Sequence, residues 1–316
     1  MSKALTTVEY VNKLYKLYNN IYDYSQADLD TFLLGTRPDR FPIESADDLA
    51  ISFMLNLWFR ARILDRRTTT FRLHAETVNH AVNHPMDQQT FGAGLRQSFG
   101  RWAIMADYRY QPRVMIRYYP PPGGGEYLAC TYSRHHAGLT ISAELSDAVS
   151  ARVTGGREFE TYRPEFAPYD SRIWRASGSL TLLCRKSIET TAEYDFKYCR
   201  AAGPTPDLSH DQHTASIAVM VPFPLVRAAT LRGEYRFAYR LYTTDLSPDQ
   251  DTPHAGRTDI IQNWEAGARI PVFKHLDLEP VFSYEYRRSS SDVYHDIGVK
   301  KNYDAFQVAC GLRFYY

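Results

Sequence analysis

The last eleven residues, Phe306–Tyr316, alternate between two kinds of side chain up to the final position. Successive side chains of a β-strand point to opposite faces, so this pattern predicts a strand with one apolar and one mixed or polar face. The apolar set is Phe306, Val308, Cys310, Leu312, Phe314 and Tyr316. Chain ends tend to fray, so a terminus that finishes on exposed aromatic residues needs an apolar environment to hold it.

A transmembrane β-barrel supplies that environment. Its last strand closes the barrel, the outward face of that strand meets lipid, and an aromatic girdle marks the interface. The apolar set also resembles the C-terminal β-signal of bacterial outer-membrane barrels. The resemblance implies that barrel-assembly machinery reads this strand during insertion, and that the mature chain lies in the outer membrane with lipid as its partner.

Composition agrees with a barrel and excludes a helical membrane protein. The chain has 24 tyrosines but a mean hydropathy of −0.43. The longest nearly apolar stretches, Leu49–Phe59 and Ala215–Val226, are shorter than the roughly 20 residues that a membrane helix needs. The net charge of +1 gives no reason to expect nucleic acid as a partner.

The same alternation recurs through the chain and predicts thirteen strands from Leu49 onward. Many of them exceed ten residues, which favours membrane-spanning strands over the shorter strands of a soluble β-sandwich or soluble closed barrel, the alternative architecture. The predicted strands are Leu49–Ile63, Thr69–Thr77, Phe91–Ser98, Arg101–Tyr118, Glu126–Leu145, Val149–Tyr162, Arg172–Leu183, Glu189–Cys199, Thr214–Phe223, Ala228–Leu241, Asp259–Ile270, Leu276–Arg287 and Tyr303–Tyr316.

Connections between these strands alternate between short and long, as periplasmic turns and external loops do in outer-membrane barrels. The short ones lie near residues 64–67, 99–100, 146–148, 184–187, 224–227 and 272–275. The long ones lie near residues 80–90, 120–125, 163–171, 200–212, 243–256 and 288–301. This order places the C-terminus in the periplasm.

The requirement for an even number of strands leaves the role of the N-terminal segment to be decided. Bacterial single-chain barrels have an even number of strands, so one strand must precede Leu49, and Tyr15–Tyr24 is the candidate. The expectation is an all-β, antiparallel, up-and-down transmembrane barrel of about 14 strands, with 12 or 16 as alternatives, in one domain over residues 1–316. The segment Tyr18–Tyr22 resembles the openings of barrels found in polysaccharide-export and related envelope proteins.

A second interpretation of the N-terminus is a short helix. Val8, Val11, Tyr15 and Tyr18 also fit helical spacing, and Thr6 with Glu9 fits a capping box. Residues 1–13 would then be a periplasmic extension or a short helix. Residues 1–9 lack the apolar core of a secretory signal peptide, which is the main fact against an exported barrel.

On this register many charged side chains face the lumen. Charges along a pore wall set ion selectivity, so they predict a polar, mildly anion-attracting conduit. The alternative is a network of arginine–carboxylate pairs that fills and stiffens a narrow barrel. The lumen candidates are Arg109, Arg113 and Arg117 on one side of one strand, Arg232, Arg236 and Arg240 on one side of another, and Glu189 and Glu193 on a third.

Two further classes of site carry less weight. His210 and His213, and the adjacent His135 and His136, have no third and fourth ligand with metal-site spacing, so no metal or other cofactor is expected. Ser209–Asp211 contains the residue types of a hydrolase triad, but neighbours in sequence are not a triad in space, and no nucleophile-elbow motif occurs. We therefore expect a non-enzymatic, porin-like channel. The alternative is a closed structural or export barrel within a larger envelope complex, and an outer-membrane hydrolase is less favoured.

Overall fold

The computed structural model describes residues 2–12, 47–63, 67–81, 84–119, 124–125, 128–184, 187–203, 207–223, 228–251, 254–293, 297 and 301–315. For residues 2–12, 47–50, 117–119, 303, 305, 314 and 315 it describes the backbone alone. None of the helices in the described part has both the length and the apolar character needed to cross a membrane.

Within these residues the chain forms fourteen β-strands and two short 3-10 helices. In chain order they are β1 (Ser2–Asn12), β2 (Asp47–Arg62), β3 (Thr68–His80), η1 (His84–Met86), β4 (Gln88–Phe99), β5 (Trp102–Tyr119), β6 (Leu128–Glu144), β7 (Val149–Tyr162), η2 (Pro164–Tyr169), β8 (Ser171–Cys184), β9 (Ile188–Ala201), β10 (His210–Pro222), β11 (Thr230–Tyr242), β12 (Arg257–Phe273), β13 (Leu276–Ser291) and β14 (Tyr303–Tyr315).

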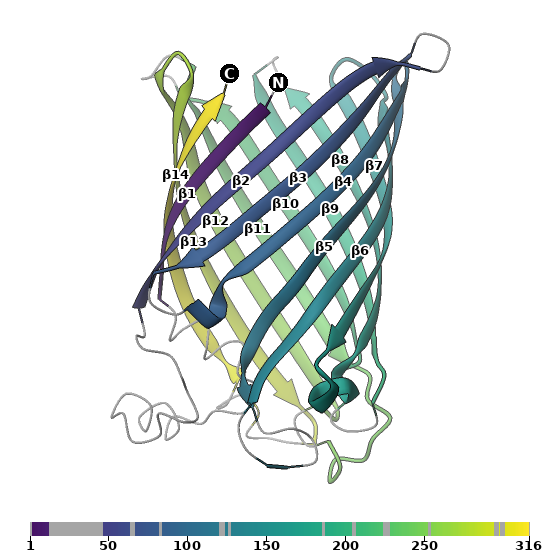
Figure 1. Ribbon diagram of the computed structural model, residues 1–316. Helices are drawn as coiled ribbons and strands as arrows, with labels where there is room; N and C mark the ends of the chain where they lie inside the picture. Colours follow the sequence, from purple (N-terminus) through teal and green to yellow (C-terminus); the bar gives the residue numbers. More distant parts are fainter. Residues whose placement is uncertain are drawn as a thin grey trace.

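Each strand pairs antiparallel with its neighbours in sequence, so β2–β14 form one continuous meander. The first strand pairs with both ends of that meander: Val8 lies opposite Ile51 of β2 and opposite Cys310 of β14. The strand order is therefore circular, and the sheet forms a barrel (Figure 1). The predicted all-β, antiparallel, up-and-down fold is confirmed, and strands such as β7 begin and end where the alternation predicted.

The two ends of the barrel differ (Figure 1). Both chain termini lie at the end where the connections are short, which we call the turn end. The β4–β5 connection there has only two residues, and Gly100 takes a φ of 70°, which glycine adopts without steric cost. The long connections, η1 and η2 lie at the opposite end, which we call the loop end.

Three features differ from the sequence-based expectations. Residues Ser2–Asn12 form a strand, where an extension or short helix was predicted, and the candidate strand Tyr15–Tyr24 lies outside the described residues. Strand β10 begins at His210, inside a predicted connection. Strand β5 has two register irregularities, between Gln111 and Val114 and between Met115 and Arg117, so its alternation is interrupted.

Candidate functional site

The outer wall of the barrel is apolar. No element among the described residues covers this wall (Figure 1), so strand side chains that are buried must point inward. The buried set includes Asn56, Thr140, Glu158 and Asp259. The residues that alternate with them are large, apolar and exposed, and they include Phe53, Leu55, Phe71, Leu73, Ile104, Leu139, Ile141, Val153, Leu180, Ile217, Val219, Leu241, Ile260 and Phe282. The barrel is thus polar inside and apolar outside.

Three arginines on the outer wall, all in the loop-end half, have guanidinium groups that lie over aromatic rings. Arg157 is 4.6 Å from the ring centroids of both Phe159 and Trp174. Arg200 lies 3.5 Å from the Tyr198 ring centroid and pairs with Asp211 at 2.9 Å. Arg288 lies 4.2 Å from the Tyr286 ring centroid. Cation–π contacts of this kind hold an arginine against an apolar wall while its donors stay available.

A network of charged side chains crosses the inner wall from β5 to β8. Glu158 is at its centre, buried, with Arg134 at 3.3 Å, Arg175 at 3.6 Å and His136 at 3.8 Å. Asp107 lies 3.9 Å from both Arg109 and His136. Arg134 also bonds Glu160 at 2.7 Å. These residues, the central network, form a wall of mutually paired charges.

Two glycines leave space for the side chains of the central network. A Cβ atom at Gly138 would lie 2.9 Å from the Asp107 carboxylate and 3.1 Å from the His136 ring. A Cβ atom at Gly156 would lie 3.0 Å from the same ring and 3.1 Å from the Ala137 carbonyl oxygen. All four distances are shorter than ordinary carbon contacts. Glycine at these positions lets Asp107 and His136 lie flat against the wall.

The predicted arginine row on β5 is broken. The expectation that Arg109, Arg113 and Arg117 share one side assumed strict alternation, and both irregularities of β5 lie between Arg109 and Arg117. Arg109 belongs to the central network. Beyond the first irregularity Met115 is buried, and Val114 and Ile116 on either side of it also pack on buried residues, so strict alternation does not hold there. The side chain of Arg117 lies outside the described part of the structure.

The predicted arginine row on β11 lies together on one face. Arg232 and Arg236 both bond Glu234, the latter at 2.6 Å, and Arg232 also lies 3.8 Å from Glu265. Arg240 donates to the Gln212 side chain at 2.9 Å. The structure therefore brings these three arginines together, but as partners of neighbouring side chains.

The predicted glutamates on β9 differ from the β11 arginines in their partners. Glu193 lies between Ser179 of β8 and Ser216 of β10, and Glu189 lies between Leu183 and Met220. Neither carboxylate forms an ion pair with a residue in the described ranges. They alternate with Tyr194 and Tyr198, which are exposed on the outer wall, so both face the lumen.

The loop end holds a buried ionic group, the mouth network, made of Asp251, His254, Arg257, Asp259 and Arg287. Arg257 and Asp259 are 0% exposed and share two hydrogen bonds of 2.9 and 3.0 Å. Arg287 donates to the same carboxylate at 2.5 Å. Asp251 bonds His254 at 2.7 Å and accepts the backbone N–H of Asp207 at 2.9 Å, so two long connections are joined here.

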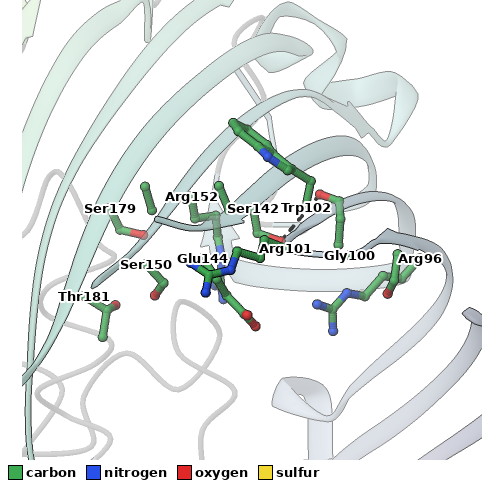
Figure 2. A pocket seen from close by; sticks show the side chains of 14 residues that line it. Arg96, Gly100, Arg101, Trp102, Ser142, Glu144, Ser150, Arg152, Ser179 and Thr181 are labelled. Carbon is green, nitrogen blue, oxygen red and sulfur yellow. Dashed lines mark hydrogen bonds between the residues drawn. The ribbon is translucent and has the colours of Figure 1, made fainter. Parts of the chain in front are cut away.

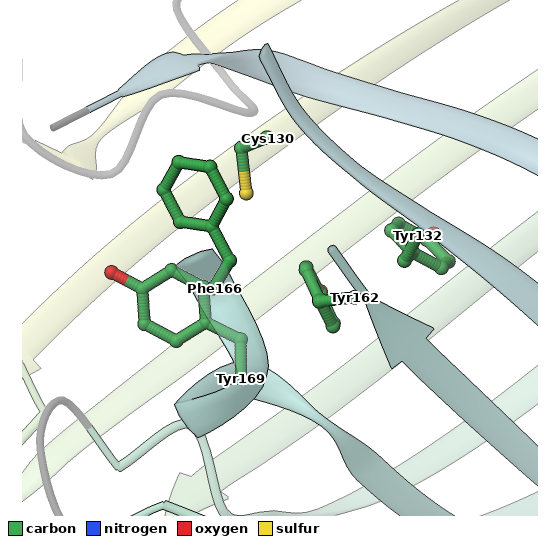
Figure 3. Packing of buried hydrophobic residues seen from close by; sticks show 5 residues of the cluster. All are labelled: Cys130, Tyr132, Tyr162, Phe166 and Tyr169. Carbon is green, nitrogen blue, oxygen red and sulfur yellow. The ribbon is translucent and has the colours of Figure 1, made fainter. Parts of the chain in front are cut away.

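The loop end also holds an aromatic group, the mouth cluster, of Cys130, Tyr132, Tyr162, Phe166 and Tyr169 (Figure 3). Phe166 of η2 is 0% exposed, so η2 is packed into the barrel end rather than extended into solvent. Gly203, after β9, donates to the Pro168 carbonyl oxygen at 2.9 Å. The mouth network and the mouth cluster both hold connecting segments in packed positions at the loop end.

At the turn end the inner wall has a recess of about 210 Å³, the turn-end recess (Figure 2). Its lining is polar and hydroxyl-rich: Arg96, Ser98, Gly100, Arg101, Trp102, Ala103, Ser142, Ala143, Glu144, Ser150, Ala151, Arg152, Ser179 and Thr181. Sequence reasoning did not select Arg96 or Arg152. The available signal was a row of inward serines and threonines on three consecutive strands, interrupted by Arg152.

The paired histidines do not converge on a ligand. His210 is buried beside Tyr242 and bonds the Leu208 carbonyl oxygen at 2.8 Å, whereas His213 bonds the exposed Tyr194 hydroxyl at 2.6 Å. Residues three apart on a strand point to opposite faces. His135 and His136 likewise separate: His135 bonds Tyr108 on the outer wall, and His136 joins the central network. Within the described residues no group of three or more histidine, cysteine, aspartate or glutamate side chains has the arrangement of a metal site.

The hydrolase candidates also separate. The Ser209 hydroxyl oxygen accepts the Ala201 backbone N–H at 3.0 Å. His210 points into the barrel, and Asp211 pairs with Arg200 on the outer wall at 2.9 Å. Ser209, His210 and Asp211 therefore do not share one face.

The closing strand β14 presents its apolar set outward. Phe306 is 64% exposed, and Val308, Cys310 and Leu312 are exposed with it, whereas Gln307, Ala309 and Gly311 line an inner recess. The side chains of Phe314 and Tyr316 lie outside the described part. Pairing of β14 with β1 makes this strand the seam of the barrel.

No protein-family model matches the chain, and no curated protein matches it in sequence. Solved structures similar in shape include a loop-deletion mutant of OmpT, an outer membrane protein of Vibrio cholerae, with 8% identity, coverage of 100% of this chain and 98% of that chain, and a TM-score of 0.49. A bacterial polysaccharide outer membrane secretin has 7% identity, coverage of 100% and 98%, and a TM-score of 0.47. An anion-selective porin from Comamonas acidovorans has 8% identity, coverage of 100% and 98%, and a TM-score of 0.45. Each TM-score lies below 0.5, so no property of these proteins is carried to this chain.

Proposed function

We propose that the chain is a bacterial outer-membrane barrel of fourteen transmembrane strands whose lumen is a polar, arginine-rich conduit for small solutes or polymers. The observation that supports this most is the inverted polarity of the barrel. Large apolar side chains are exposed around the outer wall, and charged side chains lie inside. A soluble protein does not surround itself with such a surface, whereas lipid requires it.

The orientation follows from the same proposal. The long connections face outward and the turn end faces the periplasm, as in other outer-membrane barrels. Arg157, Arg200 and Arg288 then lie at the level of the outer headgroups, where a guanidinium over an aromatic ring is suited to phosphate. The segment Phe306–Tyr316 serves as the strand that the assembly machinery reads.

Conductance tests the conduit directly. Purified full-length chain is inserted in a planar bilayer, and the current is recorded under a fixed potential. A steady open-channel current is the expected result, because charges along the turn-end half of the lumen keep it hydrated. A barrel that inserts but carries no current would contradict the conduit.

A second candidate function has an observation of its own. The mouth network and the mouth cluster pack two connections and η2 into the loop end, which favours a closed barrel that anchors or completes a larger envelope complex. A silent barrel that becomes conducting when residues 244–253 are replaced by a short glycine–serine linker would support this candidate. Conduction by the unaltered chain would count against it.

A further inference from the structure

Two of the three arginines that line the turn-end recess have no carboxylate partner among the described residues, unlike the arginines of the central network. In the central network and on β11, arginines lie within 4.0 Å of carboxylates or bond a neighbouring side chain. Among the described residues, neither Arg96 nor Arg152 forms an ion pair. Arg101 has one partner, the exposed Asp147 at 3.3 Å. Glu144 is the one carboxylate in the lining.

The surroundings of these arginines are hydroxyl groups from neighbouring strands. Ser142 lies opposite Arg152, Ser179 lies opposite Arg152 on the other side, and Ser150 lies opposite Thr181. Thr181 also shares a hydrogen bond of 3.0 Å with Thr191, so the hydroxyl row continues to β9. Figure 2 shows Arg96 on one side of the recess and Arg101, Glu144 and Arg152 on the other, with Ser150, Ser179 and Thr181 beyond them.

This combination has a defined chemical preference. A guanidinium presents a planar fork of donors that matches a carboxylate or a phosphate. Serine and threonine hydroxyls both donate and accept, which matches the hydroxyl groups of a sugar or polyol. A volume of about 210 Å³ holds a single sugar-sized solute rather than a polymer segment.

We propose that the turn-end recess is a binding subsite for sugar acids and sugar phosphates, that is, for small solutes with one anionic group on a hydroxyl-rich body. The arginines hold the anion, and the serine and threonine row holds the hydroxyl groups. This subsite rests on the proposed function for the route by which the solute reaches it. Glu144 limits the affinity, because its carboxylate repels the bound anion.

Calorimetric titration of the purified full-length chain in detergent tests the subsite, with glucuronate, glucose 6-phosphate, glucose and acetate as probes. Glucuronate or glucose 6-phosphate should bind about tenfold or more tightly than glucose and acetate, since glucose lacks the anion and acetate lacks the hydroxyls. The tighter of the two anionic probes identifies carboxylate or phosphate as the preferred group. Glucose or acetate binding as tightly as both anionic probes would overturn the proposal.

Variants at the recess give effects of opposite sign. Arg96→Gln and Arg152→Gln should each weaken binding of the preferred anionic probe about tenfold, and Glu144→Gln should strengthen it about two- to threefold. Lys274→Gln removes the same charge from the β12–β13 turn at the same end of the barrel and should leave the affinity unchanged. A heat-dependent gel shift shows that each variant is folded. Unchanged affinity in folded Arg152→Gln overturns the subsite.

Different results would contradict the conduit and the subsite. A chain that binds glucuronate with these variant effects but carries no current in a bilayer contradicts the conduit and leaves the subsite standing. A chain that conducts but does not prefer the anionic sugars over glucose contradicts the subsite and leaves the conduit standing.

Discussion

The loop end and the turn end of the lumen use the same residue types to opposite effect. At the loop end, Asp259 holds two arginines and is fully buried with Arg257. At the turn end, Arg96 and Arg152 face a hydroxyl-lined recess without a carboxylate partner among the described residues. A paired, buried charge contributes to structure, whereas an unpaired charge on a wet wall contributes a field. Whether an arginine in the lumen contributes to structure or to the field along the wall therefore depends on its partners.

The largest effect should come from breaking the mouth network. Asp259→Asn leaves Arg257 and Arg287 buried without their shared carboxylate, which should lower the free energy of unfolding by about 3–5 kcal/mol. Urea unfolding of the barrel in detergent, followed by circular dichroism, measures the loss. Glu193→Gln is the control from the turn-end half of the lumen, where a change within about 0.5 kcal/mol is expected. Equal losses in both variants would remove the distinction between the two halves.

A smaller loss of unfolding free energy should result from substituting Gly203, which joins the β9–β10 connection to η2. A Cβ atom there would lie 2.3 Å from the Pro168 Cα atom, so Gly203→Ala must push η2 out of its place. The expected loss is about 1–3 kcal/mol, with faster protease cleavage near η2. Gly155→Ala is the matched control, because nothing lies within 4 Å of its added Cβ atom. Resistance of η2 to cleavage in the Gly203 variant would show that the mouth is not packed as described.

Ion preference gives the smallest expected effect, and it tests the difference between unpaired and paired arginines. Arg96→Gln with Arg152→Gln removes two unpaired charges, and Arg232→Gln with Arg236→Gln removes two charges that both bond Glu234. The first pair should shift the reversal potential in a potassium chloride gradient further toward cations, because unpaired charges act on permeating ions with less local compensation. A larger shift from the β11 pair would mean that its ion pairs open in the working channel.

Replacing Arg232, Arg236 and Arg240 together by glutamate extends this test. If the β11 arginines line the conducting path, the variant should reverse the ion preference, since the wall then carries only carboxylates there. Unchanged preference would assign these arginines to the wall alone. The same reversal-potential measurement decides between the two.

Most of the strand pattern was predictable because a period of two is local. Each strand from β2 to β14 carries its own apolar face, and β7 could be delimited from residues 149–162 alone. The first strand was missed because Thr6 and Glu9 also fit a helix start, and its partner Cys310 is far away in sequence. The break in β5 has a local signal, Pro112, since proline within a strand favours a bulge.

The site was predictable only in part. Alternation places Arg232, Arg236 and Glu234 on one face, but whether they pair depends on side-chain geometry across strands. The mouth could not be predicted, because Asp251 and Phe166 lie in connections that have no period. Arg152 follows the regular alternation of β7, so the sequence alone does not distinguish it from other inward residues. What distinguishes it is the pair of serines that lie opposite it on the two neighbouring strands.

The inverted polarity of the barrel is the central claim, and membrane fractionation with a heat-dependent gel shift tests it most directly. Cells that express the chain are separated into soluble, inner-membrane and outer-membrane fractions, and each is run on a gel with and without boiling. Recovery in the outer membrane and a change in migration on boiling are expected, because the apolar outer wall requires lipid and the closed barrel resists detergent. Recovery of folded chain in the soluble fraction would contradict it.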